Sequence, residues 1–195
     1  MVAHFDYYYN KGDTASGKGV VWIPRTNLGN AVMNSTNTTS NGYKGSSMVS
    51  STIPSVVTKL QSVLSTYLVK NRILLTNSMG TSLSSMAGAG VTGASNGWEW
   101  VDTYAVLPNE VQIFGTTILS SSFYDVGSDD EKLAVFNFIN PTEFARSNFW
   151  LRSVASSTNF VNCNNNGNAN NNNASNSNGV RPIILNPSML MESEG

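Results

Sequence analysis

The stretch FWLRSVASSTNFVNCNNNGNANNNNASNSNGVRPIIL, residues 149–185, has the most unusual composition in this chain. Twelve of the 21 residues from 159 to 179, the Asn-rich tract, are asparagine, and bulky apolar residues flank them on both sides. An asparagine side chain offers two N–H donors and a carbonyl acceptor, and it suits turns better than strand interiors. Such a run cannot build an apolar core, so we expect a loop at the surface.

Two interpretations of the Asn-rich tract compete. A low-complexity run of this kind can be disordered and prone to β-association. An ordered loop can instead display adaptable hydrogen-bonding groups, as the Ser, Gly and Asn residues of antibody loops do. The apolar segments 149–151 and 183–185 would fix both ends of the tract, and they favour an ordered surface. A loop of this length inside a domain is usually functional when it is not disordered.

The overall composition excludes several classes of protein. Hydrophobic residues make up 40% of the 195 residues and charged residues only 12%, about half the usual share. The net charge is −1 and the basic residues are scattered, so we expect no nucleic-acid partner and no membrane insertion. Cys163 and His4 are the only residues of their types, which leaves no disulfide framework within the chain. We expect no metal site and no cofactor.

Hydrophobic spacing predicts two helices. The first covers residues 54–69, with Pro54 in its first turn and apolar residues recurring at helical intervals. The second begins at the capping-box pattern Ser128-Asp-Asp-Glu131. Short strands are expected at 19–23, 73–75, 149–151 and 180–185, and strands and turns at 98–100, 104–108 and 110–114. Pro182 places the last strand at a sheet edge or makes it begin after the proline. Two helices with short strands indicate an α+β domain.

The chain reads as one domain spanning 1–195, with a Gly- and Ser-rich internal connector at 80–97. The connector contains Gly88-Ala-Gly-Val-Thr-Gly93, a formal nucleotide-binding spacing, but no helical pattern follows it and a flexible loop is the better interpretation. The abrupt start at Met1, without a signal pattern, suggests the C-terminal part of a longer protein.

Catalytic groups are scarce. The acidic cluster 129–131 is interpreted as helix N-terminal charge. Glu99 and Asp102 flank Trp100 and could act as an acid and a base, although nothing local favours catalysis over structural hydrogen bonding. No serine lies in a Gly-x-Ser-x-Gly elbow, and Cys163 has no histidine nearby in the sequence. We therefore expect no enzyme and no catalytic residues.

Several segments resemble proteins that are varied by diversity-generating retroelements and are often encoded by phages or prophages. The segments are Ile23-Pro-Arg-Thr-Asn-Leu28, residues 33–43, residues 107–115, Phe149-Trp-Leu-Arg with the Asn run, and Gly179-Val-Arg-Pro182. These segments are spread over residues 23–182 and follow one another in the family's order. In that family a reverse transcriptase mutates template adenines, so AAC codons for asparagine are the main targets.

The resemblance implies a C-type-lectin-like fold with two helices, short antiparallel strands and long irregular loops. It also implies a variable Asn-rich loop region at 153–179, whose varied residues form a ligand-binding face. The implied ligand-binding positions are Asn159, Asn162, Cys163, Asn164, Asn165, Asn166, Asn168, Asn170, Asn171, Asn172, Asn173, Asn176 and Asn178.

One compositional observation agrees with the resemblance. Changes at the first two bases of AAC cannot produce Lys, Glu, Gln, Met or Trp, and none of these occurs between Ser153 and Gly179. Cys163 is reachable from AAC, so it is itself a candidate varied position. The many remaining asparagines indicate a sequence close to the unmutated template.

Three functions remain as hypotheses. The first is a hypervariable display protein that binds a host-surface protein or glycan, on a virion tail or capsid or on a bacterial cell surface, with a homo-oligomer as one assembly state. The second is a structural virion decoration or tail component without a tuned ligand. The third is a carbohydrate-active enzyme that uses Glu99 and Asp102. The first fits the Asn-rich tract best.

Overall fold

The computed structural model describes residues 1–80, 95–120, 124 and 126–187. Its strands are β1 (Val2–Phe5), β2 (Gly19–Trp22), β3 (Asn30–Ala31), β4 (Asn71–Met79), β5 (Ser95–Thr103), β6 (Ala105–Val106), β7 (Phe149–Val154), β8 (Asn159–Cys163), β9 (Ala169–Asn173), β10 (Asn178–Gly179) and β11 (Ile183–Pro187). Its helices are η1 (Met48–Thr52, π-helical), α1 (Ile53–Leu64), η2 (Ser65–Tyr67, 3₁₀), α2 (Glu110–Phe114), η3 (Ala134–Asn137, 3₁₀) and α3 (Pro141–Ala145).

The fold is β-rich, and the expected fold class was wrong. The described residues form eleven strands in three sheets. Among their α-helices only α1, with 12 residues, is longer than five residues. This arrangement replaces the expected α+β, C-type-lectin-like architecture of two helices, short antiparallel strands and long irregular loops. The two main differences lie at the second predicted helix and in the Asn-rich tract.

A four-stranded sheet in the order β1-β2-β11-β6 joins the two ends of the described chain. β11 pairs antiparallel with both neighbours, so that Ile184 lies opposite Trp22 on β2 and Ala105 on β6. The strand begins directly after Pro182, as the missing N–H of proline predicts. The prediction of a strand over 19–23 is also confirmed, because β2 covers most of it.

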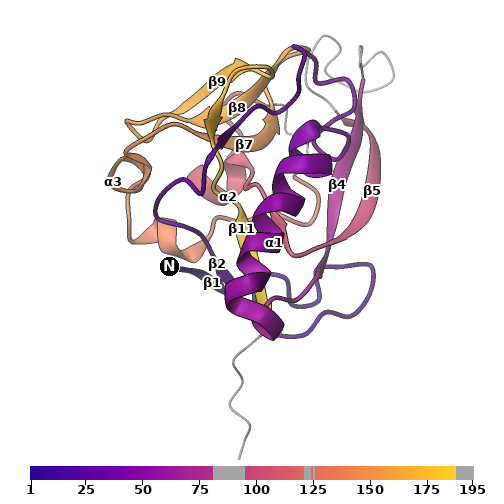
Figure 1. Cartoon of the computed structure of the whole chain (residues 1–195), viewed down its shortest axis with the longest axis vertical. Helices are drawn as coiled ribbons and strands as arrows, with labels where there is room; N and C mark the ends of the chain where they lie inside the picture. The colour runs from indigo at the N-terminus through magenta and orange to yellow at the C-terminus, as the bar shows by residue number, and fades with distance from the viewer. Residues whose placement is uncertain (81–94, 121–123, 125, 188–195) are drawn as a thin grey trace, which may run out of the picture.

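A five-stranded sheet in the order β3-β10-β7-β8-β9 occupies the upper left of Figure 1. β10 runs parallel to β7, and the other neighbours in this sheet are antiparallel. Three of its strands, β8, β9 and β10, come from the Asn-rich tract. β9 is the last strand in the order and forms one edge of the sheet.

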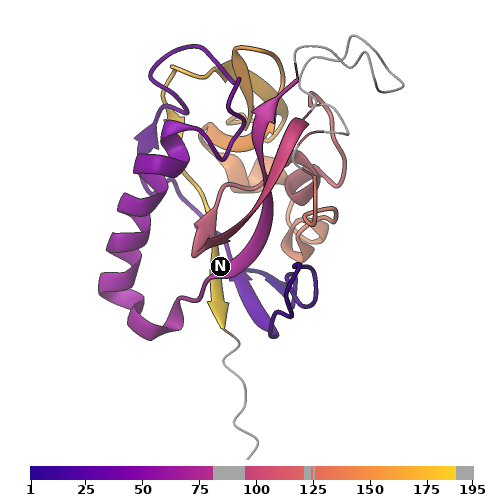
Figure 2. The ribbon, with the colours of Figure 1, turned by 90° about the vertical axis from the view of Figure 1, so that its right-hand side faces the viewer.

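A long two-stranded ribbon, β4–β5, crosses the molecule beside α1 (Figures 1 and 2). It contains both the predicted strand at 73–75 and the Trp98–Trp100 segment. The predicted connector at 80–97 was wrong for residues 95–97, which belong to β5 and pair with β4. Its residues 81–94, including the Gly88–Gly93 spacing, lie outside the described part of the chain.

The first predicted helix is confirmed over most of its length. α1 begins at Ile53 with Pro54 in its first turn, where the missing N–H has no intrahelical partner to lose. Ile53 and Val57 are buried against the core. The predicted apolar stripe fails near the C-terminal end, where the Val63 side chain is 80% exposed. Figure 2 shows α1 at the outer side of the molecule, which leaves room for such exposure.

The second predicted helix was wrong, and so was the strand expected at 110–114. Residues 128–133 are not helical, and a short 3₁₀ helix follows them at η3. The capping box lies instead at Asn109, whose Oδ1 accepts from Gln112 N at 2.8 Å while its N–H donates to Gln112 Oε1 at 3.0 Å. This reciprocal pair starts α2 within the segment predicted as a strand.

Candidate binding surface

The Asn-rich tract forms an ordered hairpin in place of the expected loop. β8 and β9 pair without a bulge from Asn159 opposite Asn173 to Cys163 opposite Ala169. Asparagine is disfavoured in strands by its local preferences, but pairing with β7 and burial of β8 override that preference. The prediction of an irregular loop was therefore wrong for this segment.

The thirteen sequence-predicted positions fall into three groups by burial. Six are exposed: Asn165, Asn166, Asn168, Asn170, Asn171 and Asn176. Four are half-buried: Asn159, Asn164, Asn172 and Asn173. Three are buried, with exposed fractions of 1% for Asn162, 0% for Cys163 and 5% for Asn178. The structure thus brings the exposed positions together on β9, the β8–β9 turn and the turn after β9.

The β8–β9 turn is fixed by side-chain hydrogen bonds. Asn164 Oδ1 accepts from Asn166 N at 2.9 Å and from Asn168 N at 3.0 Å. Gly167 adopts a left-handed backbone, with φ of 80°, and a Cβ there would lie 2.1 Å from Thr142 N at the start of α3. Only glycine permits this approach, so the turn is held against α3 while Asn165, Asn166 and Asn168 remain exposed.

A large buried layer supports the hairpin. All six residues of β7 are buried, and so are the four residues of β8 from Phe160 to Cys163. Trp150 is fully buried, and its indole N–H donates to Ala31 O at 2.8 Å. A rigid support of this kind lowers the entropy cost of ordering a contact surface.

Arg181 ties the end of the tract to the core. Its guanidinium donates to Phe144 O at 2.9 Å, Ala145 O at 2.8 Å and Ser147 Oγ at 3.1 Å. It also lies over the Phe144 and Phe149 rings, with its central carbon 4.9 and 4.8 Å from the ring centroids. Sequence reasoning named Arg181 only as part of a resemblance, because these partners lie 34 to 37 residues away.

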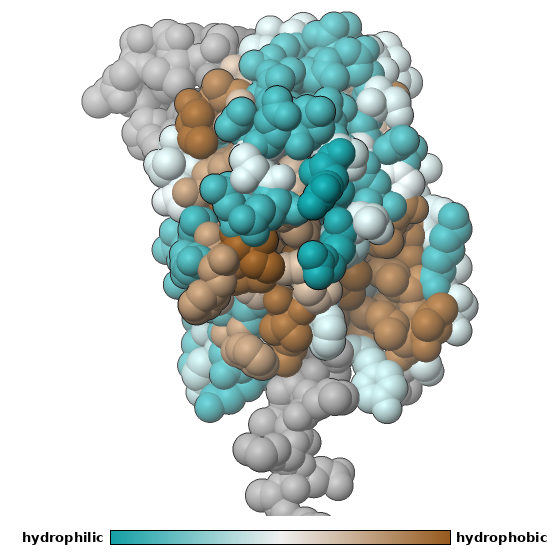
Figure 3. All heavy atoms as spheres, turned by 90° about the vertical axis from the view of Figure 1, so that its left-hand side faces the viewer, coloured by the Kyte–Doolittle hydropathy of each residue, from teal (hydrophilic) through white to brown (hydrophobic). Residues whose placement is uncertain are grey.

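The segment 33–39 forms a second boundary of the hairpin. Met33 N and Asn34 N both donate to Ala174 O at 2.9 Å. Asn37 Oδ1 accepts from Ser175 N at 3.1 Å and from Ser175 Oγ at 2.5 Å. This segment therefore orders the chain that follows β9. Figure 3 shows hydrophilic residues over the upper part of one face and hydrophobic residues below them.

Two of the buried asparagines have unsatisfied atoms. Asn162 Oδ1 and Asn178 Nδ2 are buried without a hydrogen-bond partner within the described structure.

Burial also raises the pKa of the Cys163 thiol to about 12, although the Arg181 charge opposes this rise. Cys163 is thus a neutral thiol in the core.

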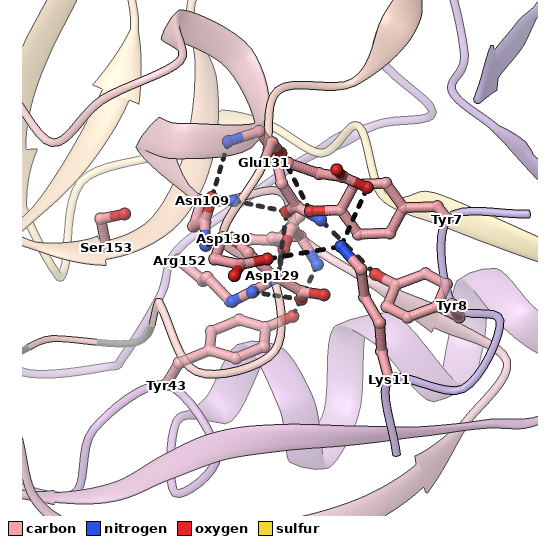
Figure 4. Close-up of polar contacts among 12 residues, drawn as sticks. Tyr7, Tyr8, Lys11, Tyr43, Asn109, Asp129, Asp130, Glu131, Arg152 and Ser153 are labelled. Atoms are coloured by element: carbon pink, nitrogen blue, oxygen red, sulfur yellow. Dashed lines mark hydrogen bonds and ion pairs between the residues drawn. The ribbon is translucent and has the colours of Figure 1, made fainter. Parts of the chain in front are cut away.

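Beneath the surface lies a buried polar cluster that sequence reasoning missed (Figure 4). Arg152 Nη2 donates to Asp129 Oδ2 at 2.5 Å, and Arg152 Nη1 donates to Leu107 O at 2.7 Å. Burial raises the pKa of Asp129, and the Arg152 charge opposes that rise. The interpretation of Asp129 as helix N-terminal charge was wrong, because no helix begins there. No local pattern links two residues 23 positions apart.

The residues of the enzyme hypothesis lie on β5, away from the tract. Glu99 pairs with Lys44 at 3.2 Å, and Asp102 pairs with Arg72 at 3.4 Å. Each carboxylate therefore has a cationic partner on the surface. Three clefts of about 350, 390 and 290 Å³ are lined by residues outside the tract. The exposed asparagines of the tract line none of these three clefts, whereas Asp102 lines two of them.

Comparison with known proteins gives one partial match. The family model described as Domain of unknown function (DUF6273) matches residues 108–187, from α2 to β11. This segment is less than half of the chain and contains the whole Asn-rich tract. No curated protein matches the chain, and no solved structure matches it. Among the described residues, no helix is long and apolar enough to cross a membrane, and no group of three or more His, Cys, Asp or Glu could hold a metal.

Proposed function

We propose that this protein is a hypervariable binding module in which a retroelement mutates the codons of exposed residues on the β8–β9 hairpin. The observation that carries the proposal is the gathering of six exposed asparagines, at positions 165, 166, 168, 170, 171 and 176, on the β8–β9 hairpin and the turn after it, above a buried support. In this copy they are close to a template sequence. The ligand is a protein or glycan on a host surface, and the module acts on a virion or a bacterial surface.

The physical support is the separation of scaffold from surface. The hairpin's hydrogen bonds to β7 and the Arg181 anchor use the backbone and residues outside the six exposed positions. Surface substitutions away from special features usually change stability by less than about 0.5 kcal/mol. Several exposed positions can therefore change together while the fold persists, which a diversified binding surface requires.

A sharp test is the DNA beside the gene. The proposal expects a near-identical copy of the segment coding for residues 149–182, next to a reverse transcriptase gene, with adenines in the copy at the varied codons. A genome that contains neither the copy nor the reverse transcriptase gene would contradict diversification by a retroelement.

A binding experiment tests the surface itself. In a displayed library, the six exposed asparagines are randomised together, and a matched library randomises six exposed positions on α1: Ser55, Thr58, Lys59, Gln61, Ser62 and Val63. Selection against intact bacterial cells should enrich binders from the hairpin library well above the helix library. Equal enrichment would favour the alternative, a structural virion decoration or tail component without a tuned ligand.

A further inference from the structure

The outer edge of β9 is closed by two asparagine side chains. Asn170 Oδ1 accepts the N–H of Asn171 at 2.8 Å, and Asn172 Oδ1 accepts the N–H of Asn173 at 3.0 Å. Asn172 Oδ1 also accepts from Asn176 Nδ2 at 2.6 Å. The side chains of Asn170 and Asn172 thus each accept a hydrogen bond from the backbone N–H of the next residue.

These two donors point away from β8. In an antiparallel ladder, alternate residues bond to the neighbouring strand. Ala174 N donates to Thr158 O and Asn164 N donates to Asn168 O, both at 2.9 Å. In the β8–β9 register, the even-numbered residues of β9 are therefore the ones whose backbone N–H and C=O groups bond to β8. The N–H groups of Asn171 and Asn173 therefore face outward at the sheet edge, where a further strand would bind.

Apart from the short length of β9, five residues, the edge lacks the usual protection against pairing. Natural edge strands carry lysine, proline or a bulge to prevent edge-to-edge association. Residues 153–180 contain no charged residue and no proline, and the β8–β9 register is unbroken. Side-chain caps from Asn170 and Asn172 are the protection that the described structure provides at these two donors.

We propose that β9 is a latent strand-pairing edge for a second copy of this chain, held closed by Asn170 and Asn172. Two β9 strands related by a twofold axis would pair antiparallel, the symmetric arrangement in which one edge matches itself. Two uncharged strands meet without repulsion, and the backbone of Asn171 supplies both a donor and an acceptor at the centre of the edge, whereas Asn173 O already accepts from Asn176 N at 2.9 Å. This inference does not depend on diversification of the tract, because it concerns the edge of this particular sequence.

The test compares the association of matched variants by sedimentation velocity over a wide range of protein concentration. Wild type is expected to stay monomeric. Asn170→Ala/Asn172→Ala should shift with rising concentration toward twice the monomer mass. Asn165→Ala/Asn166→Ala removes two exposed asparagines from the turn without opening the edge, and it should remain monomeric. Asn170→Asp/Asn172→Asp keeps both acceptors and adds charge, so it should also remain monomeric.

Two additional variants locate the contact and guard against misfolding. Adding Asn171→Pro to the double alanine variant removes an outward N–H at a position where an edge strand tolerates proline, and it should abolish the dimer. Asn170→Thr/Asn172→Thr, with strand-favouring residues, replaces the alanine pair if circular dichroism shows that the alanine pair does not fold.

Each remaining outcome overturns the proposal. If folded Asn170→Ala/Asn172→Ala stays monomeric, β9 is not a latent pairing edge. If the wild type already dimerises through β9, the two asparagines do not keep the edge closed. A dimer that survives Asn171→Pro places the contact elsewhere. A monomeric variant that binds an added Asn-rich extended peptide excludes a second copy as the occupant.

Discussion

β8 and β9 pair residue for residue and come from the same Asn-rich tract, yet their surroundings differ. β8 is buried from Phe160 to Cys163, whereas β9 has exposed or half-buried residues throughout. β8 lies between β7 and β9, and β9 is an edge. An asparagine in this tract therefore has a role set by its position: at 162 it is enclosed in the core, and at 171 it lies on the surface.

The largest expected contrast is in thiol reactivity. Burial raises the pKa of the Cys163 thiol to about 12, so only a very small fraction of it is thiolate near pH 8. Alkylation of folded wild type should be slower, by about tenfold or more, than that of Cys163→Ala/Asn165→Cys, which places the thiol on the exposed turn, because Cys163 is both buried and little ionised. Both rates should rise with pH as more thiolate forms. Equal rates, measured by mass spectrometry, would contradict the burial of β8.

A matched pair of truncations tests the same difference in stability. Phe160 on β8 lies opposite Asn172 on β9. Phe160→Ala removes a fully buried ring and should lower the free energy of unfolding by about 3–5 kcal/mol. Asn172→Ala removes only hydrogen bonds at the edge and should cost about 1 kcal/mol or less. Denaturant unfolding measures both, and similar losses would remove the distinction between the strands.

The Arg181 anchor should be sensitive to a conservative change. Arg181→Lys keeps the charge but cannot reproduce the planar set of bonds to Phe144 O, Ala145 O and Ser147 Oγ. We expect a loss of about 2–3 kcal/mol in unfolding free energy. Arg25→Lys, at an exposed position, is the control and should change stability little. An Arg181→Lys protein as stable as wild type would show that the tract is held without this anchor.

The smallest expected effect is at Asn162. Its Oδ1 is buried without a partner in the described structure, and such an atom carries an uncompensated desolvation cost. Asn162→Val should leave stability unchanged or raise it by about 1 kcal/mol or less. Thermal unfolding with calorimetry measures the change. A clear loss of stability would reveal an interaction of this amide that holds β8 in place.

The parts of the fold that sequence reasoning predicted correctly have local causes. Pro54 begins α1, and Pro182 precedes β11, because proline lacks the backbone N–H that these positions do not need. The Asn109–Gln112 capping box was missed although its spacing, an N-cap residue followed three positions later by glutamine, is a local signal. A search for that pattern would have found the start of α2.

The parts that were missed depend on distant partners. Asp129 is buried because Arg152 reaches it from β7, and the local pattern around Ser128 gives no sign of that contact. The strands of the Asn-rich tract form because β7 offers a pairing edge, which overrides the low strand preference of asparagine. The sequence could identify the positions of the candidate surface, but it could not separate exposed Asn171 from buried Asn162.

The most direct measurement is the sequencing of many sibling copies of the gene from related genomes, with each substitution mapped onto the structure. The proposed function predicts that amino-acid changes concentrate at the exposed positions 165, 166, 168, 170, 171 and 176. It also predicts few changes at buried scaffold residues such as Phe160, Val161 and Arg181. Substitutions spread evenly along the chain, or concentrated away from the β8–β9 hairpin, would contradict it.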